Sequence, residues 1–107
     1  MNITRLRELI KQQQTLDNES IDCYFPAIYD ETVEILNENL SDTITFLDTC
    51  TEEEFYWIGS TFSEVSDKYK SEEFIECIKR NMLRFPNIIT NSKTELKYAI
   101  MAMEDNE

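Results

Sequence analysis

The sequence predicts an all-α fold in which about six antiparallel helices form a single domain over residues 1–107. The chain is short enough for one domain. It contains one Gly and two Pro, so it has few residues suited to tight hairpin turns. Its apolar residues recur every three or four positions, which is the period of an α-helix and not of a strand. With 41% hydrophobic and 30% charged residues, the chain has enough apolar side chains for a folded core.

Each expected helix has a reason in the sequence. The six helices are expected to run from Ile3 to Gln14, from Asp22 or Pro26 to Asn37, from Ser41 or Asp42 to Cys50, from Thr51 to Tyr69, from Ser71 to Arg84, and from Asn91 or Ser92 to Met103. The first helix places Ile3, Leu6 and either Leu9 or Ile10 on one face. Residues 15–20 are polar and are expected to form a loop.

The second and third helices are indicated by their first turns. Pro26 suits the first turn of a helix, where its missing N–H group is not needed. The third helix is short, has Ser41 or Asp42 as its expected cap, and directs Ile44 and Leu47 inward.

The fourth helix has the clearest start signal. Thr51 and Glu54 match a capping box, and the three carboxylates of residues 52–54 lie at the positive end of the helix dipole. The apolar residues that follow are spaced by three and four positions and predict one continuous stripe that faces the core: Phe55, Ile58, Phe62, Val65 and Tyr69.

The last two helices are bounded by a serine cap and a proline. Ser71 starts the fifth helix, and Pro86 ends it because the residue before a proline avoids the helical conformation. Its inward residues are expected to be Phe74, Ile75, Ile78, Met82 and Phe85, and those of the sixth helix Leu96, Ala99, Ile100 and Met103. Residues 104–107 are expected to fray. Short connections favour antiparallel neighbours, either in a bundle or in a short α-solenoid.

The composition of the chain argues against most kinds of catalytic, cofactor and metal site. The absence of His removes the commonest general base and metal ligand, and a single glycine, Gly59, excludes glycine-rich loops that bind phosphate. We therefore expect no enzyme activity, no cofactor and no metal site. A formal net charge of −12 repels phosphate backbones and anionic lipid, so neither nucleic acid nor a membrane is an expected partner.

The cysteines and the N-terminus indicate a reducing compartment. Cys23, Cys50 and Cys77 are odd in number and include no C-x-x-C pair, so they are expected to be buried, reduced thiols. The first residues are polar and contain no apolar signal segment. A cytoplasmic location is expected.

Charge is distributed unevenly along the chain. Between Gln12 and Asp67 there are fourteen acidic residues and no Lys or Arg. Glu31, Glu34 and Glu38 share one face of the second helix, where like charges repel by a few tenths of a kcal/mol per pair. A cationic partner would relieve this repulsion. The alternative interpretation is an acidic face that is merely solvated.

Two aromatic residues flank the core stripe of the fourth helix. Tyr56 and Trp57 belong to the residue types most often used as interface anchors. The alternative is that Trp57 closes the core against the third or fifth helix, which leaves Tyr56 as the exposed anchor. Together with the acidic residues around them, the candidate partner-binding residues are Asp30, Glu31, Glu34, Glu38, Asp42, Glu53, Tyr56, Trp57 and Glu64.

Residues 42–86 resemble small all-helical immunity proteins of bacterial contact-dependent growth inhibition and related polymorphic toxin systems. The resemblance is carried by the Thr-Glu-Glu-Glu-Phe helix start at residues 51–55, the aromatic pair that follows it, the Ser-Glu-Glu-Phe-Ile segment from Ser71, and the Arg-Phe-Pro ending at Pro86. It implies a cytoplasmic protein of bacterial competition that neutralises a cognate toxin domain, often a basic nuclease, without catalysis. We expect a monomer in a 1:1 complex.

Three other classes give different expectations. A small acidic secretion or assembly chaperone would dimerise and present an apolar groove to an extended segment of its partner. An enzyme would need a concave pocket with a strongly perturbed carboxylate. A mimic of nucleic acid would bind a cellular DNA-binding protein.

Overall fold

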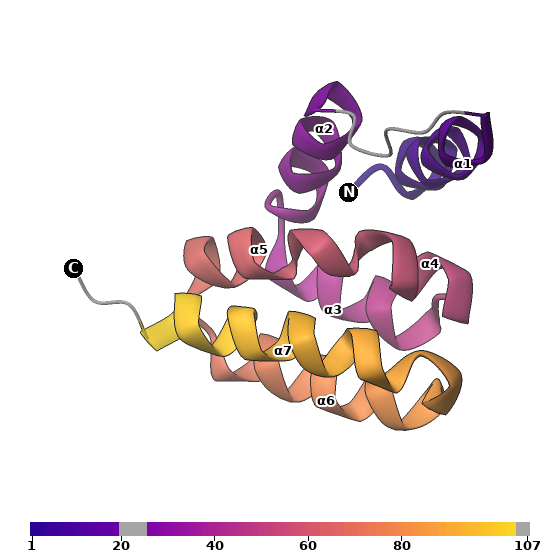
Figure 1. Cartoon of the computed structure of the whole chain (residues 1–107). Helices are drawn as coiled ribbons and strands as arrows, with labels where there is room; N and C mark the ends of the chain where they lie inside the picture. The colour runs from indigo at the N-terminus through magenta and orange to yellow at the C-terminus, as the bar shows by residue number, and fades with distance from the viewer. Residues whose placement is uncertain (20–25, 105–107) are drawn as a thin grey trace.

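The computed structural model describes residues 1–19 and 26–104 and confirms the all-α fold (Figure 1). Its elements are α1 (Ile3–Glu19), α2 (Pro26–Leu36), α3 (Leu40–Thr49), α4 (Glu52–Ile58), the 3-10 turn η1 (Gly59–Thr61), α5 (Phe62–Tyr69), α6 (Glu72–Arg84), the 3-10 turn η2 (Pro86–Ile88) and α7 (Ile89–Glu104). Because α4, η1 and α5 follow one another directly, they form one bent segment. No strand occurs in these two ranges.

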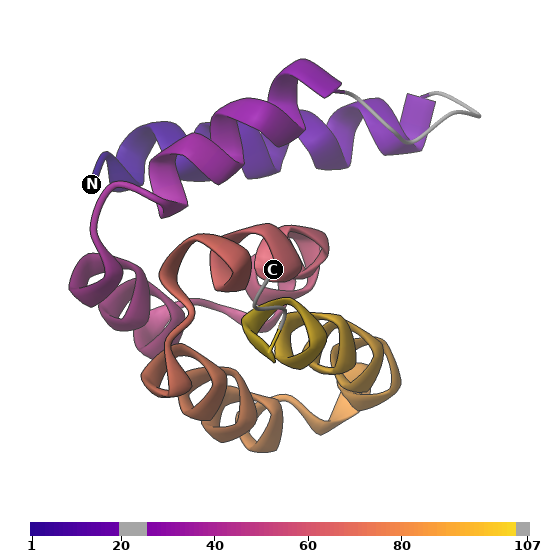
Figure 2. The same cartoon turned by 90° about the vertical axis from the view of Figure 1, so that its left-hand side faces the viewer.

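The helices form a closed bundle with a hairpin laid across it. In Figure 2, α3, α5, α6 and α7 surround a common interior. In that ring, α3 packs against α6, α6 against α7, and α7 against α5. The antiparallel hairpin of α1 and α2 covers the side formed by α4, η1 and α5. Of the two architectures that the sequence left open, the helices adopt the bundle.

Tyrosine hydroxyls connect the hairpin to the bundle. The hydroxyl of Tyr29 in α2 donates to the carbonyl of Ser60 in η1 at 3.3 Å. At the end of α2, the carbonyl of Leu36 accepts from the hydroxyls of Thr43 at 2.6 Å and Tyr69 at 3.1 Å. Since that carbonyl has no partner within its own helix, these bonds satisfy it and fix where α2 ends.

Aromatic rings fill the centre of the bundle, as the stripe along α4 and α5 predicts. Phe55 and Phe62 are buried, and their ring centroids lie 5.3 Å apart. Phe85 approaches Phe55 at 5.5 Å, and Phe74 approaches Phe62 at 5.9 Å with its ring edge-on. One inward prediction is wrong: Ile3, at the first position of α1, is 38% exposed.

Two helix starts are confirmed and one is corrected. Thr51 and Glu54 form the complete capping box, and Ser71 accepts a hydrogen bond at the start of α6. The third helix is capped by Asn39, whose side chain accepts from the amide of Asp42 at 3.0 Å. Ser41 and Asp42 therefore lie inside α3, because the extended backbone of Asn39 already places its amide oxygen over the first turn.

Two predicted boundaries are wrong, and a third cannot be compared with the structure. Residues 15–19 continue α1 instead of forming a loop, since they contain no Gly or Pro to end it. The last helix begins at Ile89, before Asn91 and Ser92, because the 3-10 turn η2 leads directly into it. The alternative start of the second helix at Asp22 lies outside the described residues.

The predicted continuous fourth helix is interrupted at Gly59. This residue has ordinary right-handed helical angles, so its conformation does not require glycine. A Cβ atom at this position would instead lie 3.3 Å from Cγ of Glu95, which is a tight contact. The glycine therefore lets α7 approach the turn closely.

Arg80 and Arg84 of α6 bind the end of α3. Arg80 donates to both carboxylate oxygens of Asp48, at 3.0 and 2.8 Å, and thereby lowers the pKa of Asp48. Arg84 donates to the carbonyls of Leu47 and Cys50, each at 3.0 Å. Positively charged side chains near the C-terminal end of a helix interact favourably with the negative pole of its dipole.

Two of the cysteines behave as expected. Cys50 and Cys77 are buried and carry no disulfide. Burial raises the pKa of each thiol to about 12, so both stay protonated and unreactive at neutral pH. Cys23 lies outside the described residues.

Candidate partner-binding surface

Among the predicted acidic residues of α2, Glu31 already has a cationic partner within the chain. Arg5 of α1 donates from Nε and Nη2 to the two carboxylate oxygens of Glu31, at 2.7 and 2.9 Å. These hydrogen bonds lower the pKa of Glu31. The side chain therefore joins α1 to α2, and we leave it out of the candidate surface.

The neighbouring carboxylates of α2 face solvent. Asp30 and Glu34 lie one helical turn apart, both are exposed, and neither forms an ion pair with a group in residues 1–19 or 26–104. Glu38 and Asp42 are also exposed and lie 3.8 and 3.4 Å from the α-amino group of Met1. Asp30 and Glu34 are thus the two carboxylates of α2 best placed to meet a cationic partner.

The second group of predicted partner-binding residues lies on the segment formed by α4, η1 and α5. Glu53 and Glu64 are exposed, and Tyr56 is 44% exposed. The hydroxyl of Tyr29 bonds to the carbonyl of Ser60, and α2 contacts η1 and α5. The structure therefore brings the two sets of predicted residues to neighbouring elements.

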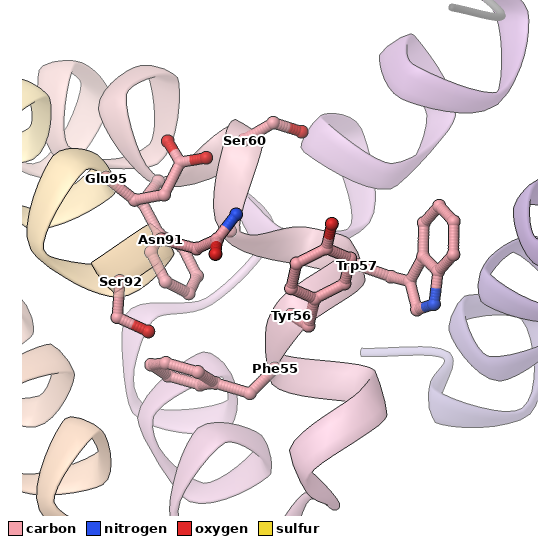
Figure 3. A pocket seen from close by; sticks show the side chains of 9 residues that line it. Phe55, Tyr56, Trp57, Ser60, Asn91, Ser92 and Glu95 are labelled. Carbon is pink, nitrogen blue, oxygen red and sulfur yellow. The ribbon is translucent and has the colours of Figure 1, made fainter. Parts of the chain in front are cut away.

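Trp57 is mostly a packing residue. It is half-buried against the core and meets the ring of Tyr56 edge-on at 5.5 Å. In Figure 3 its indole points away from Ser92 and Glu95 and toward the side of α1. One turn earlier, Glu54 binds Arg7 of α1 at 2.8 Å, which places this face of α4 against α1. Trp57 thus packs against the core with its indole directed toward the side of α1, and Tyr56 is the exposed aromatic residue.

A pocket of about 180 Å³ opens between the 3-10 turn η1 and the first turns of α7 (Figure 3). Its lining residues are Phe55, Tyr56, Trp57, Gly59, Ser60, Phe62, Asn91, Ser92 and Glu95. Glu95 is half-buried, and burial raises the pKa of its carboxyl. No described group forms a hydrogen bond or ion pair with this carboxyl.

Glu95 was not among the residues that the sequence singled out. It stands between Lys93 and Lys97, so the local charge pattern indicates an ordinary solvated helix. The spacing of Asn91 and Glu95, four residues apart, places them on one face of α7. The one available signal was the single glycine of the chain, whose position against Glu95 only the tertiary structure reveals.

The pocket has the chemistry of a binding site. Glu95 is the one carboxylate among its described lining residues. The hydroxyl of Ser92 donates a hydrogen bond to the carbonyl of Ile88 at 3.1 Å. Hydrolysis by paired carboxylates needs two such groups across the substrate, and nucleophilic catalysis needs a base beside the nucleophile. A lone carboxylate in a pocket that also contains the exposed ring of Tyr56 is instead suited to bind a cation.

The described ranges contain no group of three or more His, Cys, Asp or Glu side chains that could hold a metal ion. In the same ranges, no helix combines the length and apolar character that a bilayer crossing requires.

Comparison of the chain with models of protein families, with characterised proteins and with solved structures gives no match.

Proposed function

We propose that this chain is an immunity protein that binds a basic bacterial toxin domain through its acidic surface and neutralises it. The resemblance of residues 42–86 to immunity proteins of contact-dependent growth inhibition motivates the class of partner. The distribution of charges on the surface supports the mode of binding.

The observation that carries the proposal is how the chain uses its cations. All four arginines bind groups within the fold: Arg5 binds Glu31, Arg7 binds Glu54, Arg80 binds Asp48, and Arg84 binds carbonyls at the end of α3. The four arginines are therefore paired within the fold, while carboxylates on α2, α4 and α5 remain exposed. The surface that remains is complementary to a cationic protein.

Binding of this kind inhibits without chemistry. A nuclease that grips phosphate presents Lys and Arg around its active site, and an anionic helical surface competes for that cleft. Long-range attraction between the opposite charges accelerates the encounter. Tyr56 supplies the aromatic anchor on which such interfaces concentrate their binding energy.

The test is growth of bacteria that express the C-terminal domain encoded by the large open reading frame next to this gene, with and without the chain. The proposal predicts that the domain arrests growth, that the chain restores it, and that the two proteins copurify as a 1:1 complex. Toxicity without rescue, or no toxicity, would contradict the proposal. A dimer of this chain bound to an extended segment would favour the chaperone class.

Matched charge reversals locate the surface. The double variant Asp30→Lys with Glu34→Lys should lose rescue. The control Glu73→Lys with Glu104→Lys changes the net charge equally but alters exposed residues on α6 and α7. It should keep rescue, and both variants should keep the helical circular dichroism spectrum.

A further inference from the structure

We propose that the pocket between η1 and α7 binds the guanidinium group of an arginine side chain from the protein partner. The inference deepens the proposed function and rests on it, because the arginine would belong to the basic domain that the chain binds. It depends on the size of the pocket, on its single carboxylate and on the exposed aromatic ring of Tyr56 beside it.

The size of the pocket fits the end of one side chain. At about 180 Å³, the pocket is smaller than the sites of about 300 Å³ or more that take whole metabolites. A cavity of about 150 Å³ holds a molecule of the size of benzene. The planar end of an arginine side chain is comparable in size.

The carboxylate of Glu95 lacks a cation of its own. It is half-buried, and none of the described lining residues is Lys or Arg. Figure 3 shows its carboxylate directed toward the turn that carries Ser60, with the amide of Asn91 beside it. Partial burial of a negative charge without a partner costs free energy, and a cation that enters the pocket would offset this cost.

The exposed ring of Tyr56 favours guanidinium over ammonium. Phe55 and Phe62 are among the lining residues but are each only 1% exposed, whereas Tyr56 is 44% exposed and its ring is accessible to a ligand. A guanidinium group stacks on aromatic faces, binds a carboxylate through two parallel hydrogen bonds, and loses less hydration than an ammonium group. The positive pole of α7 opposes a cation only within the first turn, and Glu95 lies in the second.

Gly59 leaves room for the side chain of Glu95. A Cβ atom there would lie 3.3 Å from Cγ of Glu95, so any other residue would require the Glu95 side chain to shift by a few tenths of an ångström. The interruption of the helix at η1 and the close approach of α7 therefore build the site together.

The test is an NMR titration of the whole protein with N-acetyl-arginine amide, at constant ionic strength and about pH 7.5, where glutamate is normally ionised. The chain has one Gly and one Trp, so the amide of Gly59 and the indole N–H of Trp57 are recognised by residue type alone. We expect the Gly59 signal to shift saturably with a dissociation constant of about 1 to 10 mM. The indole N–H of Trp57, a lining residue whose ring points away from Glu95, should shift less.

The neutral analogue N-acetyl-citrulline amide should not saturate, and N-acetyl-lysine amide should bind more weakly. Glu95→Gln should weaken binding of the arginine probe at least about tenfold. The control Glu104→Gln removes the same charge from the exposed end of α7 and should leave binding unchanged. Equal binding of the citrulline probe or unchanged binding by Glu95→Gln would overturn the inference, as would the absence of saturation.

These outcomes separate the two proposals. If the arginine probe does not bind but the chain still rescues growth, the pocket inference fails and the proposed function stands. If the probe binds at Glu95 but the chain does not rescue growth, the proposed function fails.

Discussion

Asn81 shows how a polar residue is used in the interior of this bundle. Its side chain is fully buried between α3 and α6. The amide nitrogen donates to Asp48 at 2.8 Å and to the carbonyl of Cys77 at 2.9 Å, and the amide oxygen accepts from Arg84. Since every polar atom of the amide has a partner, the residue links the ion pair of Asp48 to the arginine that binds the end of α3.

Replacement of Asn81 by Leu keeps the volume but removes these bonds. We expect the free energy of unfolding to fall by about 1–3 kcal/mol, because buried partners of the amide lose their hydrogen bonds. Urea unfolding followed by circular dichroism measures the loss. The control Asn87→Leu, at an exposed position of η2, should change stability by less than about 0.5 kcal/mol. Equal effects of the two substitutions would contradict the structural role of Asn81.

Glu95 makes a prediction that depends on pH. Burial raises the pKa of Glu95, so the folded protein binds the proton more tightly than the unfolded chain. The ionised carboxylate therefore costs stability as pH rises through the folded pKa, and the cost is absent below the ordinary glutamate pKa of about 4.3. Glu95→Gln should raise the melting temperature at about pH 7.5 and leave it unchanged at about pH 3.5.

The exposed control Glu104→Gln removes the same charge. It should raise the melting temperature at neutral pH less than Glu95→Gln does. A lower melting temperature for Glu95→Gln at neutral pH would show that the carboxylate has an attractive partner in the free protein, against the present interpretation of the pocket.

At the scale of elements, the segment α4–η1–α5 supports both the core and the candidate surface. Phe62, the first residue of α5, lies between the rings of Phe55 and Phe74. Phe62→Ala should lower the free energy of unfolding by about 3–5 kcal/mol, measured by urea unfolding. Leu83→Ala is the matched control, because Leu83 is 79% exposed and should cost less than about 0.5 kcal/mol. A loss for Phe62→Ala below about 1 kcal/mol would contradict the packing described for this segment.

Helix starts were more predictable than helix interruptions. The capping box at Thr51 and the serine cap at Ser71 are local chemistry, so the sequence alone indicates them. The stripe of apolar residues continues through η1 with almost the helical period, so it does not reveal the 3-10 turn. The cause of the close packing at that turn, the contact of Gly59 with Glu95, joins residues far apart in the chain.

The same distinction holds for the candidate surface. The sequence predicted the excess of acid between residues 12 and 67 but not which carboxylates would be neutralised. Arg5 and Glu31 are 26 positions apart, and only the packing of α1 on α2 brings them together. Exposure of Tyr56 followed from its place beside the core stripe, whereas the pocket around Glu95 required the position of α7.

At the scale of the whole molecule, the dominant fact is the net charge of −12. Mutual repulsion of like charges destabilises the compact state, and salt screens it. Raising sodium chloride from about 0.05 to about 0.5 M should raise the melting temperature by a few degrees. Chloride is preferred over sulfate because sulfate stabilises folded proteins by exclusion from their surface. A fall in melting temperature would show that the internal ion pairs outweigh the repulsion.

The charge asymmetry gives the chain its proposed use. Arginines are engaged within the fold, and α2, which carries exposed carboxylates, packs against η1 and α5. Binding to a basic domain should therefore depend on a defined surface and not only on net charge. This difference is measurable because two sets of exposed acids carry the same charge at different places.

The most direct measurement is the affinity of the purified chain for the basic toxin domain proposed as its partner, by isothermal titration calorimetry at several salt concentrations. We predict a 1:1 complex that weakens steeply with salt, and Asp30→Lys with Glu34→Lys should weaken it at least about tenfold, or about 1.4 kcal/mol. The control Glu73→Lys with Glu104→Lys should weaken it less than about threefold. Equal losses for the two double variants, or no loss for the first, would contradict a specific acidic binding surface on α2.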